Sequence, residues 1–238
     1  MSNDIVFSGH QPNFLPYMGV IYKMFQSDVF VLDNDVQYSR TGLHNANFIK
    51  LNGEKHRITV PVSYEYGDPI NWVRICYGKD WAGKMLKTIQ MAYGRTPYFE
   101  EGYDLLKRHF NAKYDYLEDL NIALLKEISE RFNLPCMLLV ASKDLPTSHK
   151  KNDRNIFQCK TLGANVYYSG VGGREYNDEE AYRQNGIRIV YSDFQPEEYK
   201  QVGAKFIPNL SVIDYIFNQG FNLPKEWNAS RKEYTEDC

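Results

Sequence analysis

The sequence predicts an α/β fold in one domain, with a mostly parallel, Rossmann-like sheet, helices on both of its faces and an inserted β-hairpin. Residues 5–38 read as a strand, a polar loop, a helix and a second strand, because β-forming runs flank one helical period. Residues 135–191 alternate strand and helix in the same way. Such alternation requires crossover connections, which make neighbouring strands parallel. The Asn-Gly pair at 52–53, between two extended runs, predicts the hairpin.

Length and composition are those of a globular chain. The 238 residues fit one large α/β domain, which we place at 1–223, followed by a C-terminal tail at 224–238. Hydrophobic residues make up 43% and charged residues 24% of the chain, and no apolar run approaches the ~18 residues that a membrane span needs. The N-terminus MSNDIVFS lacks the positive and apolar regions of a secretory signal. We therefore expect a cytoplasmic protein with no membrane partner.

Charge and cysteine content exclude further classes. The formal net charge is -2, and the longest basic cluster is the short HKKNDR stretch at 149–154, so duplex nucleic acid is not an expected partner. The four cysteines lie far apart and form no C-x-x-C pair, which argues against a zinc ribbon and against a disulfide framework. We expect neither a metal centre nor a bound cofactor.

The polar loop HQPNFLPYMG at 10–19 is the first candidate site. It follows the short strand at 5–7, and the apolar residues after it recur on one helix face. In parallel sheets, loops at the carboxyl ends of strands line the crevice in which ligands bind. His10 could act there as a base or acid near pH 7, or it could fix the loop by hydrogen bonds. Gln11 and Asn13 offer donors and acceptors for a sugar or a nucleotide.

The middle of the chain predicts the hairpin and then three helices. The runs FIKL and RITVPV flank the turn at 52–53, and WVRICY at 72–77 alternates as a further strand. Helices are expected within 80–132, where Asp80 caps the first one. The third carries an apolar stripe that includes Leu124, which predicts that it packs on the core.

The C-terminal part returns to strand and helix and contains the second candidate site. CMLLVAS, NVYYS and IRIVY predict strands, RNIFQCKTLG and DEEAYRQNG predict the helices between them, and Ser211 caps a last helix. NVYYS leads directly into the glycine-rich turn SGVGGRE at 169–175. Its glycines let the backbone approach a ligand, its N–H groups can bind an anion, and Arg174 adds a bidentate donor. The turn is neither a P-loop nor a dinucleotide fingerprint, and a purely structural role is the alternative.

Asp33, Asp35 and Gln37 form the third candidate cluster, directly after the strand VFVL. Carboxylates at i and i+2 of an extended chain point to the same side, which would suit a metal or an acid/base pair. No histidine or cysteine stands beside them at ligand spacing. We therefore expect Asp35 to orient His10 or a substrate ammonium, the alternative being aspartates that merely end a strand.

Four segments occur in order along residues 5–219: HQPNFLPYMG, DVFVLDNDVQYS, ITVPV and YYSGVGGREYND. In order and spacing they resemble the WbqC-like family of bacterial proteins, whose genes often lie in surface-polysaccharide clusters. The resemblance implies work on sugars of the O-antigen type in lipopolysaccharide, including amide-linked substituents on amino sugars. The chain departs from the family pattern at Asn34, where a second aspartate is usual, and in NANFIK, where two basic residues are usual.

A looser similarity links the first unit to the nucleotidyltransferase and class I synthetase superfamily, in which an H-x-G-H loop holds ATP phosphates. The position of a second histidine is taken here by Gly19. This similarity implies a Rossmann-like fold more than it implies ATP as a substrate.

Three functions remain open from the sequence. The first is a transferase that moves an acyl or aminoacyl group from an unspecified carrier to the amine of a nucleotide-linked amino sugar. The second is an ATP-using adenylate-forming or nucleotidyl-transfer enzyme, which would release pyrophosphate. The third is a non-catalytic glycan- or partner-binding module, and a homo-oligomer is compatible with all three. We expect catalytic roles for His10 and Asp35, and substrate contacts from Gln11, Asn13, Lys23, Gln37, His44, Asn47, Ser169, Gly170, Gly172, Gly173 and Arg174.

Overall fold

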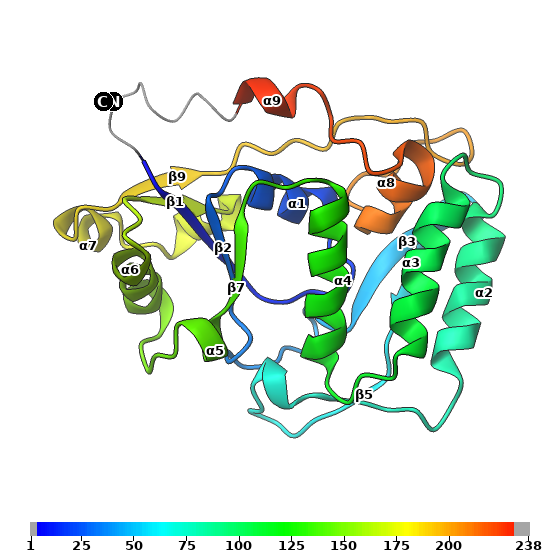
Figure 1. Ribbon diagram of the computed structural model, residues 1–238, viewed down its shortest axis with the longest axis horizontal. Helices are drawn as coiled ribbons and strands as arrows, with labels where there is room; N and C mark the ends of the chain where they lie inside the picture. Colours follow the sequence, from blue (N-terminus) through cyan, green and yellow to red (C-terminus); the bar gives the residue numbers. More distant parts are fainter. Residues whose placement is uncertain (1–3, 231–238) are drawn as a thin grey trace.

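A five-stranded parallel sheet organises the chain, of which the computed structural model describes residues 4–230 (Figure 1). Residues 231–238 of the expected tail lie outside the described range. Every pairing in this sheet is parallel, so the predicted α/β class is confirmed. In their order across the sheet, the strands are β7 (Met137–Val140), β2 (Val29–Leu32), β1 (Val6–His10), β8 (Val166–Ser169) and β9 (Arg188–Tyr191).

The chain begins this sheet at its centre. It places β2 and then β7 on one side of β1, and it later returns to place β8 and β9 on the other side. The strand order therefore reverses between β1 and β8. In doubly wound sheets, ligands bind outside the carboxyl ends of the strands at such a point of reversal.

Alternate side chains of the strands pack on two separate helical layers. Phe7 of β1 belongs to one buried cluster with Ile156, while Phe30 of β2 belongs to another with Ile21. The alternation follows from the two-residue period of a strand, which sends successive side chains to opposite faces. The layer over the first cluster consists of α5 (Ala141–Asp144), α6 (Lys151–Leu162) and α7 (Glu179–Gln184), and α1 (Met18–Phe25) lies over the second.

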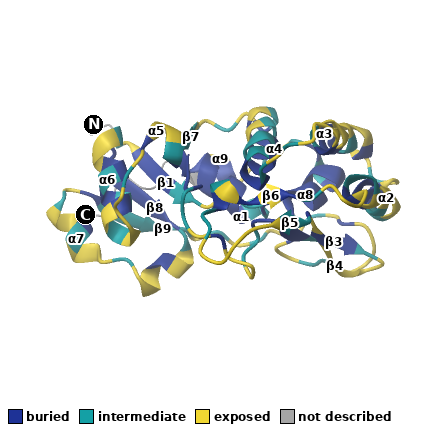
Figure 2. Ribbon diagram, turned by 90° about the horizontal axis from the view of Figure 1, so that it is seen from below, coloured by how far each residue is buried: buried dark blue, intermediate teal, exposed yellow. Residues whose placement is uncertain are grey.

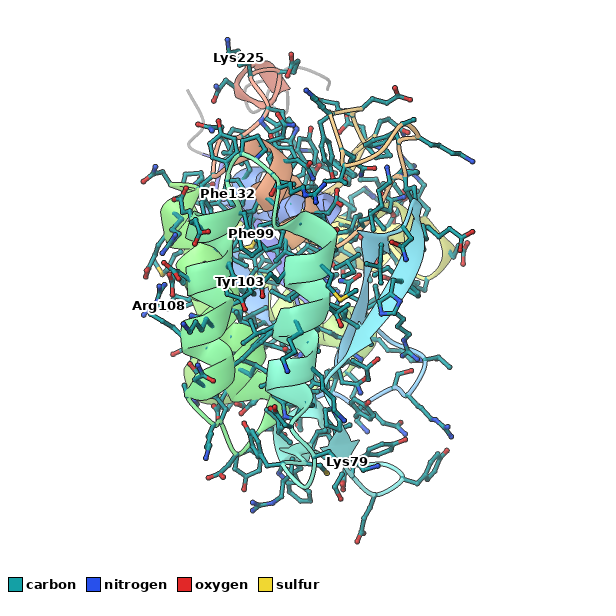
Figure 3. All side chains as sticks on the ribbon, turned by 90° about the vertical axis from the view of Figure 1, so that its right-hand side faces the viewer. Lys79, Phe99, Tyr103, Arg108, Phe132 and Lys225 are labelled. Carbon is teal, nitrogen blue, oxygen red and sulfur yellow. The ribbon has the colours of Figure 1, made fainter. Side chains whose placement is uncertain are left out.

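A large insertion separates β2 from β7 and forms the end of the molecule that Figure 3 views. The predicted hairpin is confirmed, with Asn52 and Gly53 at φ of 52° and 82°, as its two-residue turn requires. Leu124 is 1% exposed and belongs to the core, as its stripe predicts. The insertion contains β3 (Ala46–Leu51), β4 (Glu54–Thr59), β5 (Val62–Ser63), the 3₁₀-helix η1 (Ile70–Trp72), β6 (Arg74–Ile75), α2 (Trp81–Tyr93), α3 (Phe99–Asn111) and α4 (Leu117–Arg131).

The expectation of one strand over 72–77 is wrong. Trp72 ends η1, and only Arg74 and Ile75 pair as a strand, with β5. Ile70 and Val73 are both fully buried, and this spacing of three residues is the period of a 3₁₀ turn. Trp72 is left outside the core.

The C-terminal part packs back on the sheet layers through α8 (Val212–Gln219) and α9 (Trp227–Ser230). Ser211 caps α8 as expected, because its Oγ accepts a hydrogen bond from the backbone of Ile213. Trp227 lies in the segment expected to be a tail, yet it is 4% exposed, with its ring 4.9 Å from that of Tyr22. Within residues 4–230, no helix combines the length and the apolar character that crossing a bilayer requires.

Candidate functional site

The loops that follow β1 and β8 line one cavity of about 390 Å³ at the carboxyl edge of the sheet. Figure 2 views the molecule from this edge. The cavity lies where the strand order reverses, and it confirms the prediction that the two loops meet. Gly9 and His10 end β1, and Gln11 and Asn13 follow them in the first loop. Ser169 ends β8, and Gly170 leads into η2 (Val171–Glu175), which contains Gly172 and Gly173. Lys23, Asp33, Asn155, Tyr167 and Tyr176 complete the lining.

An aromatic hollow beside α9 is much smaller than this cavity. Tyr17, Phe194 and Trp227 are among the side chains that line it. Its free volume is about 30 Å³, which is about the share of one water molecule in the liquid. We therefore place the candidate site in the larger, polar cavity.

Asn47, expected as a substrate contact, instead holds the first loop in place. Its Nδ2 donates to the carbonyl of Phe14 at 3.2 Å and to that of Leu15 at 2.7 Å, and the residue is 1% exposed. Leu15 has a φ of 45°, a left-handed conformation that residues other than glycine rarely adopt. Asn121 of α4 supports the same loop by donating to the carbonyl of Pro12 at 3.1 Å. These buried amides fix the path of the loop that carries His10.

His10 enters the cavity as a neutral imidazole. Its Nε2 lies 3.2 Å from Nδ2 of Asn13. Because an amide nitrogen only donates, Nε2 is the accepting nitrogen and the neutral ring carries its proton on Nδ1. Burial above all, and then the positive charge of Lys23, lower the pKa of His10 to about 3. At neutral pH the ring therefore offers a lone pair to a ligand that can donate a proton.

Lys23 brings a positive charge to the cavity from α1. Its Nζ donates to the carbonyl of Gly9 at 2.7 Å, and the residue is 7% exposed. Burial lowers the pKa of Lys23 to about 8, against the opposing attraction of Asp33. The ammonium is thus largely protonated at pH 7 and can bind an anionic group, but it loses its charge in mildly alkaline solution.

Asp33 is the carboxylate that lines the cavity, and α6 holds it rigidly. Its Oδ1 accepts hydrogen bonds from Nε of Arg154 and from Nε2 of Gln158, both at 2.9 Å. Burial raises the pKa of Asp33 and outweighs the opposing effect of Arg154. The neighbouring Gly9 must lack a side chain, because a Cβ there would lie 2.8 Å from Oδ2 of Asp33.

Asp35, which we expected to orient His10, does not line the cavity. Its carboxylate binds Arg154 instead, with Oδ1 2.5 Å from Nη2 and Oδ2 3.3 Å from Nη1. The i, i+2 spacing does place Asp33 and Asp35 on the same side of the chain, because both reach this one guanidinium. Of the two aspartates, Asp33 is the one that lines the cavity.

The glycines of the second loop serve two different purposes. A Cβ on Gly173 would lie 2.1 Å from Oγ of Ser169, so the packing of the loop itself demands glycine there. Ser169 in turn accepts a hydrogen bond from Nδ2 of Asn177 at 3.0 Å. At Gly170 and Gly172 an added Cβ would meet no atom within 4 Å, and neither residue has a positive φ. Protein packing does not explain these two glycines, whereas a ligand against the backbone would.

Three other expected substrate contacts lie outside the cavity. Arg174 stacks on the ring of Tyr191 at 4.2 Å and lines a separate, open hollow beside β9. Gln37 is exposed and pairs with Pro69 in an isolated β-bridge. His44 is 1% exposed and packs against the ring of Tyr38 at 5.5 Å. Arg174 and Gln37 are held by contacts with other segments of the chain, which the sequence pattern did not contain.

Asn155, Tyr167 and Tyr176 are cavity residues that the sequence did not single out. Asn155 donates through Nδ2 to the hydroxyl groups of Tyr167 at 3.1 Å and of Tyr182 at 3.0 Å. The sequence held one clue to Asn155, which is its place near the start of α6. A helix that follows a parallel strand begins at the carboxyl edge of the sheet, so its first residues face the two loops. An amphipathic period alone does not reveal that placement.

The site combines a neutral proton acceptor, an ammonium group and a fixed carboxylate with several amides and hydroxyls. Arg154 and Asp35 form an ion pair outside the cavity lining. Lys23 and Asp33 are therefore the charged groups that a ligand would meet. Such a lining suits a polar ligand with an anionic part and a group that gives up a proton.

Comparison with known proteins places these residues in a wider group. The model of the WbqC-like protein family matches residues 11–226, which include every cavity residue except Gly9 and His10. The uncharacterized protein Rv1507c of Mycobacterium tuberculosis (strain ATCC 25618 / H37Rv) is 29% identical over 218 residues. That alignment covers 90% of this chain and 94% of the relative.

Proposed function

The chain belongs to the WbqC-like protein family, and from this premise we propose that it is a transferase of surface-polysaccharide biosynthesis. In this proposal it transfers an acyl or aminoacyl group to the amine of a nucleotide-linked amino sugar. The reaction would take place in the cavity between β1 and β8. The link to surface polysaccharides comes from the family resemblance, and the type of chemistry comes from the cavity.

The neutral His10 beside a charged Lys23 is the observation that carries the proposal. Acylation of an amine needs a group that removes a proton from the nitrogen and a group that stabilises negative charge on the carbonyl oxygen. His10 can do the first, because its Nε2 is unprotonated and can accept the amine proton once the substrate displaces the amide of Asn13. Lys23 can do the second, because its ammonium is largely protonated at pH 7.

The proposed reaction proceeds by addition and elimination at the donor carbonyl. The sugar nitrogen attacks the carbonyl carbon and forms the new C–N bond, while its proton passes to Nε2 of His10. The bond between that carbon and the leaving group then breaks, and His10 returns the proton to the leaving group. His10 ends the cycle neutral, as it began, and no oxidant or metal is consumed.

The anionic part of the nucleotide sugar would prepare His10 for this role. We place its pyrophosphate against the open backbone of Gly170 and Gly172, in the same cavity as Lys23, whose ammonium is left to the donor carbonyl. The negative charge of the pyrophosphate would offset that of Lys23, which is the second largest cause of the low pKa of His10. Binding would therefore raise the pKa of His10 and make it a stronger base while the substrate is present.

The experiment that tests this proposal is a transfer assay read by mass spectrometry. Probes are UDP-glucosamine and dTDP-linked amino sugars, combined with acyl thioesters of coenzyme A and with aminoacyl donors. Wild-type protein should add the mass of the acyl group to the sugar nucleotide. His10→Asn should lower turnover by about 10² to 10⁴ while leaving calorimetric binding within a few-fold. His56→Asn, at an exposed histidine of β4, is the matched control and should behave as wild type.

Other outcomes would support the competing readings. Release of pyrophosphate from ATP, with an adenylate on the product, would identify a nucleotidyl-transfer or adenylate-forming enzyme. Binding of the sugar nucleotides without any turnover would identify a binding module. Equal rates for His10→Asn and wild type would remove His10 from the mechanism.

A further inference from the structure

An open groove of about 630 Å³ lies in the insertion, lined by Tyr116 and by residues within 63–74, which run from β5 through η1 to β6, and it shares no residue with the cavity. Its exposed tryptophan, Trp72, is unusual for this chain. Trp72 is 65% exposed, whereas Trp81 and Trp227 are 7% and 4% exposed. Tyr64, 38% exposed, lines the same groove. A large aromatic ring held at the surface beside a hollow is a frequent mark of a binding site.

Two of the three aromatic rings of the groove, those of Tyr64 and Tyr116, are held by side-chain contacts. The ring centroid of Tyr64 lies 4.5 Å from that of the buried Tyr38. Tyr116 on the opposite wall lies 4.7 Å beneath the guanidinium of Arg74, whose Nη2 also donates to its hydroxyl at 2.9 Å. A ligand that stacks on these rings would meet side chains that have already lost much of their rotational freedom.

The rest of the lining is polar and includes Ser63 and Asn71. Glu65 and Asp68 add two carboxylates, and Arg74 adds one guanidinium. The groove thus contains more negative than positive charge, and it offers acceptors as well as donors close to the rings.

We propose that this groove binds one or two pyranose units of a neutral or amine-bearing oligosaccharide. A pyranose has an apolar face of C–H groups, which stacks on an aromatic ring, and an edge of hydroxyl groups. Those hydroxyls need acceptors such as Glu65 and Asp68 and donors such as Arg74. The excess of carboxylates disfavours uronic acids, nucleotides and nucleic acids and favours a sugar with a free amine.

The groove and the cavity flank the same short segment of chain. The backbone N–H of Asn71 donates to the carbonyl of Asn34 at 2.9 Å, and that of Tyr38 donates to the carbonyl of Asp68 at 2.8 Å. Asn34 directly follows Asp33, which lines the cavity. In Figure 1 the β5 region lies at the lower edge, toward which the carboxyl ends of β2 and β7 point.

Fluorescence can test the groove directly, because Trp72 is the tryptophan open to solvent. Probes are tetramers of glucosamine, of N-acetylglucosamine and of glucose, with tetragalacturonate as the anionic comparison. Acrylamide quenching of the wild-type protein should fall when the neutral or amine-bearing tetramers are added, and it should not change with tetragalacturonate. Calorimetry should give a dissociation constant that Trp72→Ala weakens at least tenfold and Trp72→Phe weakens only a few-fold.

Tyr66→Ala is the matched control, since Tyr66 is 98% exposed in the same loop but does not line the groove. It should bind the tetramers as wild type does. Tetramer binding that survives Trp72→Ala, or no binding by any tetramer, would overturn the proposal. A dimer in sedimentation that Trp72→Ala dissolves, without sugar binding, would identify a protein interface instead. His10→Asn should leave tetramer binding unchanged, so failure of the transferase proposal and failure of the groove proposal are separate results.

Discussion

Replacing Arg154 by methionine should destabilise the protein strongly, because this one side chain pairs with two carboxylates. Its guanidinium donates to Asp33 through Nε and to Asp35 through Nη1 and Nη2. The side chain of Arg154 is 8% exposed, and those of Asp33 and Asp35 are 13% and 23% exposed. Water can therefore hydrate Asp35 in part, whereas Asp33 would remain a buried and uncompensated charge.

Breaking a buried ion pair from one side typically costs about 3 to 5 kcal/mol, and we expect Arg154→Met to fall in that range at pH 7.5. Urea unfolding with linear extrapolation measures this change. Arg183→Met is the matched control, because Arg183 pairs with Glu180 at 2.7 Å on the surface, where its side chain is 76% exposed. Its effect should stay within about 0.5 kcal/mol.

The pH dependence of Arg154→Met follows from Asp33. Burial already raises the pKa of Asp33, and losing Arg154 removes the main opposing influence, so this pKa should rise further. A carboxyl group with a folded pKa above its unfolded value binds its proton more tightly in the folded state. Stability is then lowest above the folded pKa and recovers as pH falls through it. The loss measured at pH 7.5 should therefore shrink at pH 5.

A double variant separates the charge from the packing. Adding Asp33→Asn to Arg154→Met should recover part of the lost free energy at pH 7.5, because the uncompensated charge is gone. A loss below about 1 kcal/mol for Arg154→Met would contradict the account of the buried pair. A loss of unfolding free energy that is equal at pH 7.5 and pH 5 would also contradict it. The same holds for a loss that does not change when Asp33→Asn is added.

Three further predictions concern the core and the cavity. Leu124→Ala should lower the free energy of unfolding by about 2 to 5 kcal/mol, since Leu124 is 1% exposed; a urea curve like that of wild type would contradict this. Gly172→Ala should leave urea stability near wild type but weaken calorimetric binding of UDP-glucosamine, because its Cβ meets no protein atom; unchanged binding would count against a ligand there. Lys23→Gln should raise the pKa of His10 in a histidine NMR titration, though burial keeps it below its ordinary value; an unmoved pKa would show that the two groups do not interact.

The sheet could be predicted from the sequence because its signals are local. Each strand is a short apolar run, and each connecting helix has its own period and cap, such as Asp178 before α7 and Gly163 in a left-handed conformation after α6. Crossover connections then make the strands parallel. These rules bring the loops after β1 and β8 to one edge, which is why His10 and Gly172 were expected in one pocket.

The details of the site could not be predicted, because they depend on contacts between distant parts of the chain. The sequence puts Asp33 and Asp35 on one side, but Arg154 decides which of them faces the cavity, and it lies about 120 residues further along. Asn47 looked like a ligand contact because it is polar and near a turn. Only the path of the loop shows that the carbonyls of Phe14 and Leu15 use its amide.

Asn34 shows how a departure from a family pattern can have a structural reason. Its Nδ2 donates to Oε2 of Glu118 at 2.5 Å and to Oγ of Ser142 at 2.7 Å, and the residue is fully buried. An aspartate there would place a second carboxylate against Glu118 without a donor between them. The burial of Trp227 could not be predicted either. No pattern near it in the sequence indicates a core residue, and its ring is buried by Tyr22 and Phe25 of the distant helix α1.

The most direct test of the central claim is an NMR titration of the histidine side chains with and without a nucleotide sugar. The signal of His10 is assigned by its loss in His10→Asn. In the free protein we expect a neutral ring with its proton on Nδ1 throughout pH 5 to 9, because burial and Lys23 hold its pKa near 3. Saturating UDP-glucosamine should shift this signal and raise the pKa of His10. A His10 that titrates near 6.5 and does not respond to the nucleotide sugar would contradict the account.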